Sequence, residues 1–230
     1  MKSLFFTGTI ALLLTAPVSA FDCKVFIPTQ EGAEYVTTSY NKRDKPETIV
    51  HRKLTKVETV GDKTVFYMHQ LITDKKGKKP LENTYRFNCR GGIFYVDMKL
   101  FLNQPQMKAY QDMEMTVDAD GLEMPKEGTA GQKLNDGKIT ATVNMGMPLK
   151  INVTVSNRTV NGTESITTSA GTFECIKLTE DVDLQIAFVK TAYRTVTWYA
   201  ENHGVIRQET YNPDKPEKPT GYSVLTEIRK

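Results

Sequence analysis

Residues 157–178, NRTVNGTESITTSAGTFECIKL, hold serines, a cysteine and acidic side chains within one hydroxyl-rich stretch. Ser165, Ser169 or Cys175 could act as a nucleophile only with a base beside it and a third group to orient that base. No GxSxG elbow or protease-type cysteine signature is present. The bases on offer are the three histidines of the chain, His51, His69 and His203. We therefore interpret the stretch as hairpin backbone with hydroxyls on a solvated face.

Methionine is the one residue type with unusual placement. Seven of the nine methionines lie between Met98 and Met147. Thioethers can fill gaps in a core, line an adaptable apolar groove or bind copper(I). We favour core packing, then a groove, then copper. The residues expected to line such a groove belong to two M-x-M pairs, Met113, Met115, Met145 and Met147.

Other metal chemistry has little support in the sequence. Asp118, Asp120 and Gly121 match the beginning of a calcium-binding loop, but the pattern is two residues short and lacks the closing glutamate. We interpret these residues as a hairpin turn. We expect no metal site and no cofactor.

Three cysteines, Cys23, Cys89 and Cys175, allow one disulfide and leave one thiol. Three pairings exist. We favour Cys23–Cys89, because that bridge would fasten an otherwise frayed end to an interior strand. Cys175 lies in an apolar run, and we interpret it as a buried, inert thiol.

The first twenty residues have the pattern of a secretory signal: Lys2, an apolar run, and small residues at 18–20. We therefore expect a signal peptide at 1–20 and a single exported domain at 21–230, in the periplasm or at the cell surface. No later segment is apolar enough to span a bilayer. The formal charge of +3, with signs interspersed, argues against a nucleic-acid-binding surface.

Alternation of apolar and polar residues dominates the rest of the chain. In residues 138–145, KITATVNM, every second side chain is apolar, and the pattern resumes after Pro148. Such alternation indicates half-buried antiparallel strands. Pairs such as Asp120-Gly121 and Asn161-Gly162 predict tight turns between strands, with the second turn at 160–163 and a further bend at 169–171.

The predicted fold is all-β, with roughly ten antiparallel strands in a strongly curved sheet or a partly open β-barrel. A sheet of that many long strands tends to curl. Residues 100–113 have no clean alternation, and one short helix is predicted at 106–113, with Pro105 at its first position.

Two longer runs are similar to a known family. Residues 157–173 resemble its n-R-x-V-x-g-x-E-x-x-T-T-x-A-G-T-F run, and residues 198–211 resemble its W-Y-A-x-x-x-G-x-V-x-x-E-x-Y run. The chain thus resembles the TapB-like family of uncharacterised exported proteins of Gram-negative bacteria. The resemblance implies an all-β exported domain and supplies no catalytic residues. Ser169 and the Asn202-His203 pair depart from the family pattern.

Three hypotheses of function follow. The first is a non-enzymatic envelope protein that binds a lipid or acyl chain in its concave face. The second is a protein–protein interaction module of the periplasm or cell surface. The third is a hydrolase, which the residue inventory disfavours most.

Overall fold

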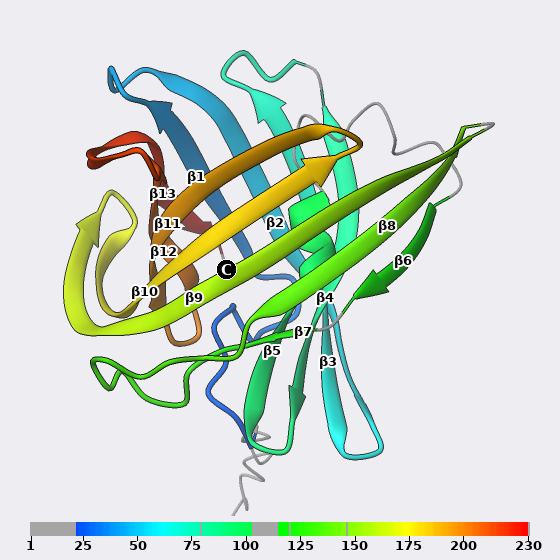
Figure 1. The fold of residues 1–230 in the computed structure, drawn as a ribbon. Coiled ribbons are helices and arrows are strands. Elements are labelled where there is room, and N and C mark those ends of the chain that lie inside the picture. The colour runs from blue at the N-terminus through cyan, green and yellow to red at the C-terminus, as the bar shows by residue number, and fades with distance from the viewer. Residues whose placement is uncertain (1–21, 79, 103–114, 120, 146, 230) are drawn as a thin grey trace, which may run out of the picture.

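The computed structural model describes residues 22–78, 80–102, 115–119, 121–145 and 147–229. These residues form thirteen antiparallel strands and a short 3-10 helix, η1 (Met98–Leu102), which confirms the predicted all-β class but exceeds the expected strand number (Figure 1). The strands are β1 (Glu34–Asn41), β2 (Pro46–Val60), β3 (Lys63–Asp74), β4 (Leu81–Arg90), β5 (Ile93–Asp97), β6 (Met115–Ala119), β7 (Gly121–Glu123), β8 (Gly137–Met145), β9 (Met147–Thr168), β10 (Gly171–Ile186), β11 (Val189–Ala200), β12 (Gly204–Asn212) and β13 (Lys215–Arg229).

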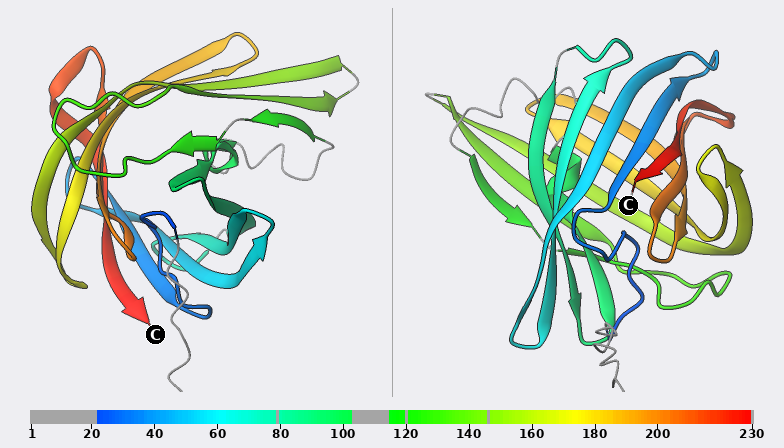
Figure 2. Two further views of the ribbon diagram at one scale, coloured as in Figure 1. Left: turned by 90° about the horizontal axis from the view of Figure 1, so that it is seen from below. Right: turned by 180° about the vertical axis from the view of Figure 1, so that it is seen from behind.

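All thirteen strands belong to one sheet, in the order β6-β8-β9-β10-β11-β12-β13-β1-β2-β3-β4-β5-β7. The end strands β6 and β7 are separated by residue 120 alone. Ala119 pairs with Ile139 of β8, whereas Gly121 pairs with Asp97 of β5. Because Cα atoms two residues apart lie within roughly 7 Å, the two ends of the sheet meet here. The sheet therefore curls into a nearly closed barrel (Figure 2).

Side chains that alternate along the strands fill the barrel. On β8, Ile139, Ala141 and Val143 are fully buried, as their spacing predicts. They join inward residues of β9 and β10 in one apolar cluster. A larger cluster collects side chains from strands around the barrel, among them Phe66 of β3 and Leu178 of β10. Because residues from so many strands meet in one cluster, the middle of the barrel is packed.

The segment before β1, residues 22–33, covers one end of the barrel (Figure 2). Val25, Phe26 and Ile27 are buried there, and the backbone N–H of Asn202 donates to the carbonyl of Val25 (2.8 Å). A disulfide between Cys23 and Cys89 ties this segment to β4. We call this end the plugged rim. Cys175 is buried with a free thiol.

Antiparallel pairing distributes the hairpins between the two ends of the barrel. The β2–β3, β4–β5, β9–β10 and β11–β12 turns lie at the plugged rim. The β1–β2, β3–β4, β8–β9, β10–β11 and β12–β13 turns lie at the opposite end, which we call the distal rim.

The predicted turn at 160–163 is wrong, because β9 runs straight through it. Lys177 pairs with Gly162 and Leu178 pairs with Val160, so Asn161 is an extra residue in the ladder. Such a β-bulge uses the positive φ of Gly162 (109°) to bend the strand while pairing continues on both sides. The chain reverses later, after Thr168, where the bend at 169–171 was predicted.

Asp120 of the predicted Asp120-Gly121 turn lies outside the described residues. The strands on either side of it, β6 and β7, pair with β8 and β5 and not with each other. The helix predicted at 106–113 lies outside the described residues. No helix within the described part of the chain is long and apolar enough to cross a membrane.

Candidate functional site

The described surface has two notable hollows, one at each rim. The hollow at the distal rim has a volume of about 430 Å³ and lies between the β1–β2 and β3–β4 hairpins. Its charged lining residues carry both signs: Lys45, Lys75 and Lys76 are basic, and Glu47 and Asp74 are acidic.

The hollow at the plugged rim has a volume of about 480 Å³ and is the better candidate site. Phe26, Phe173 and Tyr199 supply aromatic walls. Cys175 and His203 also line it, from β10 and from the β11–β12 turn. The structure thus brings together two residues that lie far apart in sequence.

Cys175 is poorly suited to nucleophilic attack. Its side chain is 1% exposed, and its Sγ–H donates to the carbonyl of Phe173 (3.4 Å). Burial raises the pKa of the thiol to about 12, and the nearby carboxylates of Glu174 and Glu164 add to the rise. The thiol therefore stays protonated at neutral pH, whereas a nucleophilic cysteine must be a thiolate.

His203 is held by contacts of its own. Its Nδ1 lies 2.8 Å from the carbonyl oxygen of Glu201, and its ring packs edge-on against Phe173 at 5.1 Å between centroids. No hydrogen bond among the described residues links His203 to Cys175. Ser169, another candidate nucleophile, donates its hydroxyl hydrogen to the carbonyl of Thr226 (2.9 Å). The hollow can enclose a ligand, but its residues are not arranged as a nucleophile and its base.

Only one group of potential metal ligands occurs among the described residues, and it contains the disulfide. Asp22, Cys23 and Cys89 lie within 4.8 Å of one another. Because the two sulfurs are bonded to each other, they are not thiolate ligands.

The methionines predicted to line a groove fall on neighbouring strands. Met145 pairs with Met147 at the β8–β9 hairpin, and Met115 pairs with Val143 on the adjacent pair of strands. All three positions lie towards the distal rim. Met113 lies outside the described residues.

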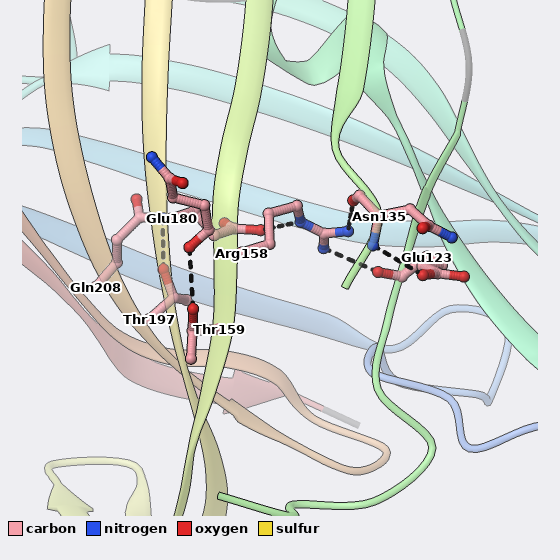
Figure 3. Close-up of polar contacts among 8 residues, drawn as sticks. Glu123, Asn135, Arg158, Thr159, Glu180, Thr197 and Gln208 are labelled. Carbon is pink, nitrogen blue, oxygen red and sulfur yellow. Dashed lines mark hydrogen bonds and ion pairs between the residues drawn. The ribbon is translucent and has the colours of Figure 1, made fainter. Parts of the chain in front are cut away.

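A buried ion pair is the most elaborate polar arrangement in the barrel (Figure 3). Arg158 of β9 is 1% exposed, and its Nε–H donates to Oε1 of Glu180 on β10 (2.7 Å). Its Nη1 and Nη2 groups donate to the carbonyls of Asn135 (2.9 Å) and Glu123 (2.8 Å). Each nitrogen of the guanidinium thus has a partner within the chain, so we assign Arg158 to the architecture rather than to a ligand site.

Arg158 fastens the segment between β7 and β8 against β9. Two backbone hydrogen bonds also join this segment to β9. The N–H of Leu134 donates to the carbonyl of Arg158 (3.0 Å), and the N–H of Val160 donates to the carbonyl of Gln132 (2.9 Å). The ion pair lies between the two apolar clusters, with Val160 in one and Val155 in the other.

Further polar side chains lie on the inner face of the barrel. Gln208 of β12 donates to Oγ1 of Thr197 on β11 (3.0 Å). On the other side of β13, Arg52 donates to Gln70 (2.9 Å) and to Thr37 (3.1 Å). Thr197, Gln70 and Thr37 are all buried. These bonds satisfy polar groups that would otherwise be costly to bury.

Sequence reasoning missed the buried pair, although a signal was present. On β10 the inward positions include Leu178, Val182 and Leu184, and Glu180 falls on the same face. A lone carboxylate in an apolar stripe implies a buried cation as its partner. Arg158 could not be chosen as that cation, because a second register shift beside Asn157, whose φ is 54°, moves Arg158 onto the inward face after Val155.

The chain matches the DUF3108-like family over residues 30–225. It belongs to this family. The narrower TapB-like assignment remains a resemblance. No curated protein matches this DUF3108-like chain.

Two crystal structures are similar to the DUF3108-like barrel. One is a candidate exported protein with a YmcC-like fold from Bacteroides fragilis, with a TM-score of 0.74 and 23% identity; the match covers 90% of this chain and 100% of that one. The other is a candidate lipoprotein from Parabacteroides distasonis, with a TM-score of 0.77, 22% identity and the same coverage. At these identities the likeness establishes a shared fold.

Thiol counting tests the cysteine chemistry. In the native protein we expect no labelling by iodoacetamide near neutral pH, because the Cys175 thiol is buried and its pKa is raised to about 12. Denaturation should expose one reactive thiol, and reduction after denaturation should expose three. Mass spectrometry of the labelled chain gives these counts. Rapid labelling of native Cys175 would contradict the assignment.

Substitution of Arg158 tests the buried pair. We expect Arg158→Met to lower the free energy of unfolding by about 3–5 kcal/mol, because Glu180 would keep a buried charge without its partner. The matched control is Arg194→Met, which breaks the more exposed Arg194–Asp181 pair between β10 and β11 and should cost less than about 1 kcal/mol. Urea unfolding measures both. Equal losses would show that burial of the pair is unimportant.

Proposed function

We propose that this DUF3108-like protein is a non-enzymatic protein of the cell envelope that works by binding through the distal rim of its barrel. The carrying observation is the tip of the β10–β11 hairpin, where the Phe188 side chain is 99% exposed and that of Val189 is 69% exposed. Two adjacent apolar side chains exposed together at a projecting tip are a candidate contact for another molecule, as larger apolar patches are. The packed interior also favours binding at the surface over binding inside.

The chemistry of the candidate nucleophiles supports a non-enzymatic role. Cys175 is buried with a raised pKa, and His203 is engaged by Glu201 and Phe173. Of the three hypotheses drawn from the sequence, the hydrolase therefore remains the least supported.

Three observations support the envelope as the location. Residues 1–20 have the pattern of a secretory signal. A disulfide joins Cys23 and Cys89, and disulfides persist in oxidising compartments. The similar proteins from Bacteroides fragilis and Parabacteroides distasonis are described as a candidate exported protein and a candidate lipoprotein.

Site-specific photo-crosslinking in cells tests the binding role. With a photoreactive phenylalanine at position 188, we expect adducts with envelope components, either protein or lipid. The matched control is the same group at Val60, which is 61% exposed at the β2–β3 hairpin of the plugged rim and should give few adducts. Equal yields at the two positions would remove the distal rim as the binding surface.

Binding of an apolar small molecule such as a lipid or acyl chain is the second candidate function. The hollow of about 480 Å³ with its aromatic walls favours it, since ligand pockets of this size are common. Solvent extraction of gently purified protein, followed by mass spectrometry, should then yield a stoichiometric ligand, and Phe173→Ala should reduce its amount. Protein that carries nothing after gentle purification would count against this candidate.

A further inference from the structure

The β10–β11 hairpin reverses with residues that are unusual for so tight a turn. Ile186 pairs with Val189, so Ala187 and Phe188 alone form the loop. Two-residue hairpin loops favour Asn, Asp and Gly, which accept positive φ and face water readily. Here Ala187 adopts a φ of 52°, and Phe188 projects almost wholly into solvent. Alanine rarely adopts a positive φ, and phenylalanine is costly to expose to water. These two mismatches point to a role for the apolar side chains themselves.

The charges around this tip have one sign. Lys190 follows Val189 on β11, and the carbonyl of Lys150 on β9 accepts the N–H of Ala187 (3.2 Å). Both lysines are exposed. Within residues 148–152 and 185–191 no acidic residue occurs, and Asp183 is the next acid along β10. The tip therefore combines a projecting aromatic side chain with nearby positive charge.

The β8–β9 hairpin is the neighbour of this tip in the sheet. β9 continues beyond Ile151, which pairs with Ile186, to the β8–β9 turn at Met147. The strand there reads Met147-Pro148-Leu149-Lys150, again an apolar run followed by a lysine. This run shares Lys150 with the β10–β11 tip, and its Leu149 packs against the apolar cluster of β8 and β9.

We propose that the β10–β11 tip inserts Phe188 and Val189 into the surface of a lipid bilayer that carries anionic headgroups, with Lys150 and Lys190 against the phosphates. This proposal rests on the proposed binding role of the distal rim and names its partner. Aromatic side chains are favoured at the boundary between headgroups and acyl chains, and lysines beside them are attracted to anionic lipid.

The size of the tip favours a bilayer over a protein partner. A standard protein interface buries about 800 Å² on each partner, whereas one phenylalanine buries roughly 150–250 Å². On their own, the two projecting side chains fall short of that area. A bilayer needs no complementary shape and accepts a small convex tip.

Vesicle binding by the purified protein tests the proposal. The probes are vesicles of phosphatidylcholine, with or without one third phosphatidylglycerol, in a sedimentation assay. We expect binding to the anionic vesicles, weakened by salt and by the absence of phosphatidylglycerol. Phe188→Ser should weaken binding about tenfold, and the double variant Lys150→Gln, Lys190→Gln should remove most of the preference for anionic lipid. Val60→Ser, at the exposed valine of the plugged rim, should bind as the unmodified protein does.

A second readout does not depend on losing binding. Phe188→Trp places an exposed indole at the tip, while the single native tryptophan, Trp198, is 5% exposed. Its emission should shift to the blue when anionic vesicles are added, whereas that of the unmodified protein should not. Absence of vesicle binding, or an equal loss in Val60→Ser, would overturn the proposal. Crosslinking of position 188 to a protein or to a second copy, without vesicle binding, would overturn it and leave the binding role of the rim intact.

Discussion

Closure of the sheet is the constraint on which the rest of this structure depends. A sheet edge exposes unpaired N–H and C=O groups, and a barrel removes that liability by pairing its two edges. Here the two edge strands, β6 and β7, are consecutive in the chain, so they bring the edges of the sheet close together without pairing with each other: Ala119 pairs on the β8 side and Gly121 on the β5 side. The approach is close: a Cβ on Gly137, where β8 begins, would lie 2.3 Å from Leu122 Cδ2. A side chain at position 137 would therefore force Leu122 to shift at this seam.

Because the middle of the barrel is filled by side chains, contacts with other molecules are expected at its ends. Apolar clusters and the Arg158–Glu180 pair occupy the middle, and residues 22–33 cover one rim. Among the described residues, the hollow at each rim and the hairpins of the distal rim are open to other molecules. The hollow at the plugged rim and these hairpins differ in character, since the hollow is concave and lined by aromatic side chains whereas the hairpins project with Phe188 at a tip.

The face of a strand that each side chain occupies could be predicted from the sequence, because it repeats every two residues. Which residues of distant strands pair with one another could not be predicted. The inward face of β8 follows directly from Ile139, Ala141 and Val143, because the pleat fixes the period. A positive φ at Gly162 is equally consistent with a turn and a bulge, and only its distant partner on β10 decides between them. The meeting of Cys175 with His203 depends on the pairing of β10, β11 and β12. The turn at Ala187-Phe188 carries no turn residue, so nothing in the sequence indicated it.

Burial of Cys175 has a consequence for how the chain matures. Three thiols permit two wrong pairings, and both require Cys175. Once the barrel has closed, that sulfur lies behind packed side chains and is out of reach of an oxidant or a partner thiol. The correct disulfide therefore depends on whether folding precedes oxidation. A chain that folds first can form only the Cys23–Cys89 disulfide. A chain that is oxidised while it is unfolded can be trapped with a wrong disulfide.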